Sequence, residues 1–130
     1  MGTPDSSVAE IEIATRDGYT AARFVGTFSV PGFQRRAEAA SQACRDVKTG
    51  LLFVDATAFD VSPSLLERYD LASHAVRVSA GLKVALLVVP AFLDPNKFGI
   101  VVAQNRGLKV EAFTDRQKAL DWLLAPASGA

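Results

Sequence analysis

Three segments of this chain each begin with a proline, end with a glycine and alternate with apolar runs, and this pattern constrains its fold most strongly. The segments cover residues 31–50, 63–81 and 95–107. Proline fits the first turn of a helix, where its missing N–H is not needed, and glycine takes the left-handed position that ends one. A fourth helical pattern starts near residue 114 and stops before Pro126. The chain is therefore predicted to contain four helices.

Short apolar or alternating runs precede the predicted helices. Residues 51–54 and 84–89 are continuously apolar, as strands covered on both faces are, and residues 108–113 form a shorter run of the same kind. Residues 10–13 alternate, and Asp17-Gly18 offers a tight turn into a strand over residues 20–28. The order β-β-α-β-α-β-α-β-α predicts an α/β domain with a mostly parallel sheet, whose first strand runs antiparallel at or near an edge.

Polar residues before the helical segments predict where the helices begin. Ser62 and Asp94 stand directly before prolines and are expected to be N-caps, whereas Val30 would be a poor cap for the first helix. Thr114 and Gln117 have the spacing of a capping box at the start of the last helix.

Hydrophobic spacing assigns a buried stripe to the second helix. The stripe consists of Leu65, Tyr69, Ala72 and Val76. His74 lies roughly opposite it and is expected to be solvated, and Cys44 is interpreted as a small core or boundary residue. One cysteine and one histidine exclude an internal disulfide and a Cys-based zinc site, and leave little room for a His-centred active site.

The charges of the chain balance, with 14 Lys and Arg against 14 Asp and Glu in 130 residues. Gripping nucleic acid or an anionic membrane needs a basic excess, which argues against both as the main function. The longest apolar run, residues 84–93, is far short of the ~20 residues of a membrane helix. No secretion signal opens the chain, and we expect a cytoplasmic protein with one domain at 8–125, a flexible leader at 1–7 and a flexible tail at 126–130.

Two stretches carry a resemblance to a known family. They are LLFVDATAFDVSPS at residues 51–64 and an ending that combines AQNRG at 103–107, FTD at 113–115 and ALDWL at 119–123. With the order of elements, they resemble the STAS-like, SpoIIAA-like proteins of bacteria over nearly the whole chain. The resemblance implies an interaction or ligand-binding module rather than an enzyme, and no cofactor.

The resemblance also implies a place for regulation. In the anti-sigma factor antagonists of this family, a serine at the start of the second helix follows an aspartate and is phosphorylated. The corresponding residues 60–65 read DVSPSL, which has no Asp-Ser pair and contains a proline. The chain is therefore more similar to the uncharacterised SpoIIAA-like branch. Ser62 and Ser64 are the candidate phosphoacceptors, because a helix N-terminus stabilises phosphate, and the alternative is that they serve only as a cap and a first-turn residue.

Asp55 and Asp60 are the candidate acid–base pair. Asp55 closes a buried strand, where open α/β sheets place functional residues. Neither has a histidine, a lysine or a glycine-rich loop at a readable spacing. The favoured interpretation is that Asp55 accepts hydrogen bonds from loop N–H groups.

Aromatic side chains follow three of the predicted strands. They are Phe28, Phe33, Phe59 and Phe92. The carboxyl ends of parallel strands meet at one edge, so these rings are expected to gather there and could form an apolar ligand site. The alternative is that they fold inward and fill the top of the core.

These observations lead to two hypotheses of different class. The first is a noncatalytic module that binds a protein partner through the second helix and the preceding loop, from Thr57 to Tyr69, with Asp55 beside it. The second is a carrier or sensor of a small apolar molecule at the aromatic edge. Homodimer formation through an exposed first strand also stays open. Glu10 and Glu12 on that strand could equally protect the sheet edge by charge.

Overall fold

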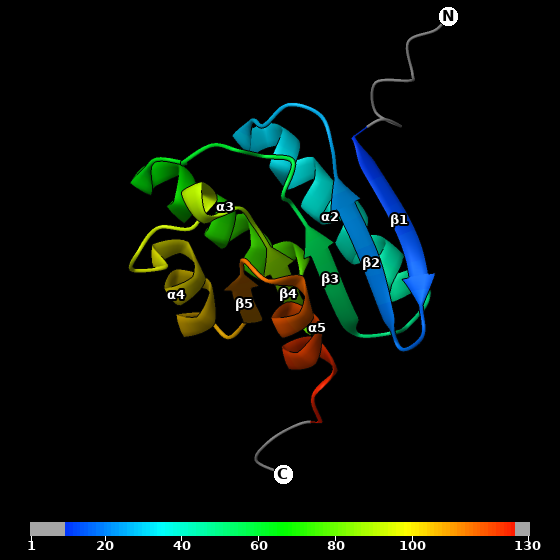
Figure 1. Cartoon of the computed structure of the whole chain (residues 1–130). Helices are drawn as coiled ribbons and strands as arrows, with labels where there is room; N and C mark the ends of the chain where they lie inside the picture. The colour runs from blue at the N-terminus through cyan, green and yellow to red at the C-terminus, as the bar shows by residue number, and fades with distance from the viewer. Residues whose placement is uncertain (1–9, 127–130) are drawn as a thin grey trace, which may run out of the picture.

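A computed structural model describes residues 10–126 and shows a mixed five-stranded sheet with helices on both faces (Figure 1). The predicted leader and most of the predicted tail lie outside the described residues. The elements along the chain are β1 Ile11–Arg16, β2 Tyr19–Phe24, α2 Val30–Asp46, β3 Leu51–Asp55, α3 Leu65–Val78, β4 Lys83–Leu87, the 3₁₀ turn η1 Pro90–Phe92, α4 Phe98–Asn105, β5 Lys109–Phe113 and α5 Arg116–Leu124.

The strands lie in the sheet in the order of the chain. β1 pairs antiparallel with β2, and β2, β3, β4 and β5 are parallel. The predicted α/β class, the order of elements and the antiparallel first strand are thereby confirmed. Each parallel connection passes through a helix, as the requirement for a crossover dictates.

Two hydrophobic layers enclose the sheet. The larger one lies between the sheet and α2, α3 and α4, and its centre includes Phe24, Leu52, Val88 and Ala103. The smaller one lies under α5, where Phe53, Ala85 and Leu123 meet. α5 packs on β3, β4 and β5. In Figure 1 it lies in front of the sheet, near β4, and leaves β1 and β2 uncovered. Cys44 is fully buried in the larger layer, as predicted.

The helix boundaries differ from the prediction where a different residue supplies the cap. Ser29 is the N-cap of α2, and its Oγ accepts a hydrogen bond from the Gly32 N–H at 3.0 Å, so Val30 is the first helical residue instead of the cap. Lys48, at φ 59°, takes the left-handed position after α2, which was expected of Gly50. Gly107 does take that position after α4, and the N–H groups of Gly107 and Leu108 satisfy the last carbonyls of the helix.

The last two helices also begin later than predicted. α4 starts at Phe98, with Lys97 as the N-cap in a left-handed conformation, although the Asp94 carboxylate still accepts from the Phe98 N–H at 2.9 Å. α5 has Asp115 as its N-cap, which accepts from the Lys118 N–H at 3.0 Å. The predicted capping box at Thr114 was therefore wrong by one residue. Among the described residues, none of the helices is both long and apolar enough to cross a membrane.

Candidate functional site

The start of α3 carries the large apolar side chains with the highest exposed fractions among the described residues. Leu65 and Leu66 are 61% and 69% exposed, and Val61 and Tyr69 are 37% and 39% exposed. We call these four residues the α3 surface. Leu65 and Tyr69 were predicted to be buried, and that prediction was wrong. Burying a leucine normally stabilises a protein by about 1.5–3 kcal/mol, so two exposed leucines on one helical turn are a feature that needs an explanation.

Arg68 explains why the helix presents these residues to solvent. Its side chain lies in the core side of α3 and is only 10% exposed. Nη1 donates to the Phe92 carbonyl, and Nη2 donates to Ser62 Oγ at 3.3 Å. The Asp94 carboxylate lies 3.9 Å from Nη1. These partners hold Arg68 inward, which leaves Leu66, two residues earlier and on the opposite side of the helix, facing outward. Leu65 is the first residue of α3, and nothing in the hydrophobic spacing predicted this arrangement.

The two candidate phosphoacceptor serines have different roles from those predicted. Ser64, not Ser62, is the N-cap of α3, and its Oγ accepts from the Glu67 N–H at 3.2 Å. Glu67 Oε1 accepts from the Ser64 N–H at 2.8 Å in return, which completes a capping box. Pro63 precedes the helix and is buried, while both serines are exposed. Ser62 is the acceptor for Arg68 instead of a cap.

Asp55 ends β3 as predicted and is buried, with a residual exposure of 7%. Oδ1 accepts from the backbone N–H and the hydroxyl of Thr57, at 3.0 and 2.6 Å. Oδ2 accepts from Arg116 Nη2 at 2.6 Å, across the start of α5. The guanidinium of Arg116 also lies over the Phe53 ring, 5.2 Å from its centroid. Asp60 is exposed and has no part in this network of described residues.

The hydrogen bonds to Asp55 decide its protonation. Burial raises the pKa of the carboxyl, but the donors from Thr57 and Arg116 outweigh burial and hold the pKa below its ordinary value. The network therefore makes Asp55 a fixed anion that ties the end of β3 to α5. This is the favoured interpretation from the sequence, with Arg116 as the partner that the sequence did not reveal.

A pH titration of stability tests this network. The folded-state pKa of Asp55 lies below its unfolded value, so the carboxylate contributes stability above the unfolded value of about 3.9, and that contribution is lost as the pH falls through the folded value. Asp55→Asn is expected to cost about 1–2 kcal/mol at pH 7 and progressively less as the pH falls below about 3.9, measured by urea unfolding. Asp60→Asn is the matched control. A constant difference between Asp55→Asn and wild type across this range would contradict the account.

The predicted aromatic residues do gather at the carboxyl ends of the strands. Phe28, Phe33, Phe59 and Phe92 pack with Phe24, with ring centroids 5.1–6.5 Å apart. We call these five residues the aromatic cluster. Phe59 and Phe92 are buried and Phe28 and Phe33 are half-buried, so the rings fill the upper part of the core.

A cavity of about 120 Å³ lies next to the aromatic cluster, between the sheet and α2, α3 and α4. Its walls are almost entirely apolar, and three members of the cluster line it, namely Phe24, Phe33 and Phe92. Phe28 and Phe59, which the sequence placed in a ligand site, do not line it. Arg68, Asp94 and Lys97 add ionisable groups to the wall.

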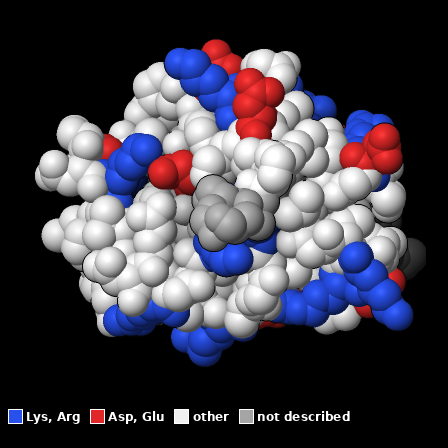
Figure 2. All heavy atoms as spheres, turned by 90° about the horizontal axis from the view of Figure 1, so that it is seen from below, with Lys and Arg blue, Asp and Glu red and all other residues white. Residues whose placement is uncertain are grey.

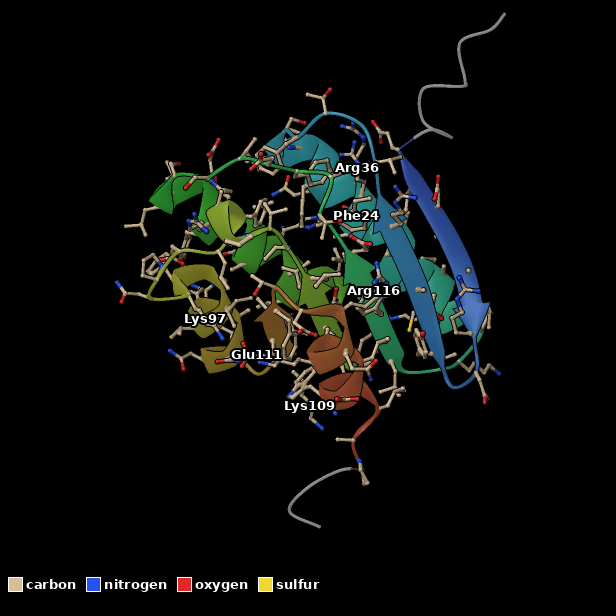
Figure 3. The ribbon with its side chains drawn as sticks, viewed as in Figure 1. Phe24, Arg36, Lys97, Lys109, Glu111 and Arg116 are labelled. Carbon is tan, nitrogen blue, oxygen red and sulfur yellow. The ribbon has the colours of Figure 1, made fainter. Side chains whose placement is uncertain are left out.

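Arg36 is a second buried guanidinium that the sequence did not reveal. It is 3% exposed and lies at the upper end of α2, above Phe24 (Figure 3). Nε donates to the carbonyls of Glu10 and Val25, at 2.9 and 3.1 Å, and Nη2 donates to Val25 at 2.7 Å. Gly32 leaves room for it, because a Cβ there would lie 2.7 Å from Nη1. Arg36 thus joins the start of β1 and the end of β2 to α2.

His74 is buried as well, which corrects the prediction that it is solvated. Its Nε2 lies 2.8 Å from the Glu38 carboxylate of α2, and the side chain is 11% exposed. The pair joins α3 to α2. A partner from a distant helix allows this position to face inward, and helical spacing within α3 alone did not reveal it.

The face at the lower ends of the strands offers a contrast to the α3 surface. Lys and Arg side chains lie at its rim and near its middle, and acidic and uncharged residues lie between them (Figure 2). Among the described residues in this view, the basic groups do not merge into one field. Charge therefore does not single out this face as a binding site.

Comparison with known proteins adds the fold family. No family model matches the sequence, and no curated protein matches it. An anti-sigma factor antagonist from Mycobacterium paratuberculosis matches in structure with a TM-score of 0.56 and 15% identity, over 95% of this chain and 98% of the other. The chain has a SpoIIAA-like fold. An uncharacterized DUF3478 protein from Shewanella loihica PV-4, described as having this fold, matches with a TM-score of 0.53 and 22% identity, over 87% and 91% of the two chains.

Proposed function

We propose that this SpoIIAA-like protein is a noncatalytic regulatory module that binds a protein partner through the α3 surface. The observation that carries the proposal is the exposure of Leu65 and Leu66 on the first turn of α3. A patch of this kind is typical of a protein–protein interface, whose buried centre is apolar. The similarity in fold to an anti-sigma factor antagonist supports a role of this class. The proposed setting is the cytoplasm.

The charges beside the α3 surface specify the partner further. Asp60 in the preceding loop and Glu67 and Asp70 in α3 are acidic, and Asp60 and Asp70 are exposed to solvent. Arg68 points inward, and Arg106 is engaged with the α3 surface itself, since its Nη2 donates to the Tyr69 hydroxyl at 2.8 Å, so the free charges beside the surface are mainly acidic. We infer a partner that presents apolar side chains with a basic rim, because complementary charge speeds association and excludes wrong partners.

The noncatalytic part of the proposal rests on how the polar groups are used. Asp55 accepts three hydrogen bonds that hold it as an anion. A general acid or base needs a proton that it can exchange with a substrate. Asp55 does not meet that need, because protein donors occupy both of its oxygens.

Ser62 is the serine at which a phosphate group could bind a neighbouring arginine. Its Oγ lies 3.3 Å from Arg68 Nη2, and the hydroxyl is exposed. A phosphoserine beside an arginine forms charge-assisted hydrogen bonds. A phosphate on Ser64 would compete with the capping box of α3, because the same Oγ accepts from the Glu67 N–H.

Site-specific photo-crosslinking tests the proposed surface. A photoreactive side chain at position 66 in the full chain, expressed in the host, is expected to capture one main partner. The matched control places it at Val101 of α4, which is 43% exposed and outside the α3 surface. Purified partner must then protect position 66 from labelling by a soluble probe. Equal capture from positions 66 and 101 would contradict the proposal.

The second candidate function is the binding of a small apolar molecule, and the observation that favours it is the cavity of about 120 Å³. Engineered apolar cavities of about 150 Å³ bind benzene, so a molecule of this class is of suitable size. The site differs from the predicted one, since Phe59 closes the core beside it and does not line it. Native mass spectrometry of protein from its host distinguishes the candidates: an apolar molecule released on gentle heating supports the carrier, and bare protein counts against it.

A further inference from the structure

The two edge strands of the sheet, β1 and β5, differ in whether side chains cover their outward backbone groups. On β5, the outward carbonyl of Val110 accepts from Gln104 Nε2 at 2.8 Å, and the Ala112 N–H donates to the Glu111 carboxylate at 3.0 Å. Lys97 binds the same carboxylate at 3.1 Å and lies on that side of the molecule (Figure 3). Side chains thus occupy this edge and block the addition of a strand.

The edge formed by β1 has no such cover among the described residues. The Val25 N–H donates to the Glu10 carbonyl at 3.0 Å, so the even-numbered residues of β1 turn their backbone groups toward β2. Ile13 and Thr15 therefore turn theirs outward, and no described residue forms a hydrogen bond with these groups. Ile13 is 43% exposed. β1 forms the outer border of the sheet in Figure 1.

The side chains of β1 are self-complementary in charge. Glu12, Ala14 and Arg16 lie on the same side of the sheet as α5, with Ala14 in the middle, and α5 packs on β3, β4 and β5 without reaching them. In an antiparallel pair of two such strands centred on Ala14, Glu12 of each copy lies opposite Arg16 of the other. This register also places Ile13 opposite Thr15, which is the pairing that their outward N–H and C=O groups require. A centre at Glu12 would place two like charges opposite each other.

We propose that β1 pairs with β1 of a second copy of this chain and joins two sheets into one across a two-fold axis. A symmetric interface must be complementary to itself, and an acidic and a basic residue at equal distances from Ala14 meet that requirement. Edge strands that avoid pairing are protected by devices such as lysines, prolines, bulges or a covering loop. β1 instead carries opposite charges that face each other in the register centred on Ala14, which its outward backbone groups allow. The proposal is independent of the α3 surface.

A charge exchange tests this interface, with size-exclusion chromatography and light scattering on the full chain as the readout. Wild type is expected to run at twice its mass of 13.8 kDa at sufficient concentration. Glu12→Arg and Arg16→Glu are each expected to weaken the dimer about tenfold or more, since they replace attraction by repulsion at two equivalent positions. An equimolar mixture of these two variants is expected to recover a dimer, because each then meets the opposite charge.

Two further variants make the test specific. Lys109→Glu changes a charge on the opposite edge and is expected to leave the dimer intact. Ile13→Pro removes only an outward N–H and is expected to give a folded monomer, with its circular dichroism unchanged. A wild-type protein that stays monomeric at millimolar concentration would overturn the proposal. So would a dimer that persists in both charge variants, or a mixture that does not recover the dimer.

Discussion

Phe59→Ala is expected to destabilise the protein by about 3–5 kcal/mol, a large part of the 5–15 kcal/mol that usually holds a domain together. Phe59 is 2% exposed and packs against Phe24, Phe28 and Phe33. The Arg36 guanidinium lies over its ring, 5.1 Å from the centroid. Truncation would open a void in the middle of the aromatic cluster, which no neighbouring side chain can fill without moving.

Urea unfolding measures this loss directly. Phe28→Ala is the matched control, because Phe28 belongs to the same cluster but is only half-buried, and we expect it to cost about half as much or less. A loss below about 1 kcal/mol for Phe59→Ala would show that the ring lines an accessible site instead of the core. The same result decides whether ligand experiments with Phe59 variants can be interpreted, since an unfolded variant binds nothing.

Arg36→Met is expected to cost about 2–4 kcal/mol, the second largest effect that the structure predicts. Methionine keeps the apolar stem but removes the donors to the carbonyls of Glu10, Val25 and Thr27. The Glu10 carbonyl would keep the Val25 N–H, but the Val25 and Thr27 carbonyls would lose the guanidinium, and unsatisfied groups cost more than the net value of a hydrogen bond. Arg36→Lys is expected to rescue little of the loss, because one ammonium cannot replace a planar fork.

The neighbouring arginine provides a control for Arg36. Arg35 also reaches Glu10, but it binds the carboxylate, and its side chain is 60% exposed. Exposed ion pairs of this kind contribute little, so Arg35→Met is expected to change stability by less than about 1 kcal/mol. Equal losses for the two methionine variants would contradict the role assigned to Arg36.

The sequence was sufficient for the order of elements because continuous apolar runs and proline–glycine boundaries are local signals. The alternating residues at β1 and the Asp17-Gly18 turn also lie close together in the chain, and the predicted hairpin formed there. The start of α3 was misplaced although its signal was present. Ser64 and Glu67 have the spacing of a capping box, and the Ser62-Pro63 pair was preferred to it.

The candidate site was harder to predict because long-range polar contacts shape it. Arg68 occupies the inner face of α3 because the Phe92 carbonyl, far along the chain, accepts from it. His74 is buried because Glu38 of another helix binds it. Helical periodicity counts apolar residues and cannot register either contact, so it assigned Leu65 and Tyr69 to the core.

The affinity of a captured partner for two matched variants tests the proposed function most directly. Isothermal titration would compare wild type with a Leu65→Lys/Leu66→Lys double variant and with Val101→Lys, each first shown to be folded by its unfolding curve. The account predicts a loss of about a hundredfold or more in the double variant, because two exposed apolar side chains are replaced by charges that repel a basic rim. It predicts little change for Val101→Lys. Unchanged affinity in the double variant would show that α3 does not form the interface and would contradict the account.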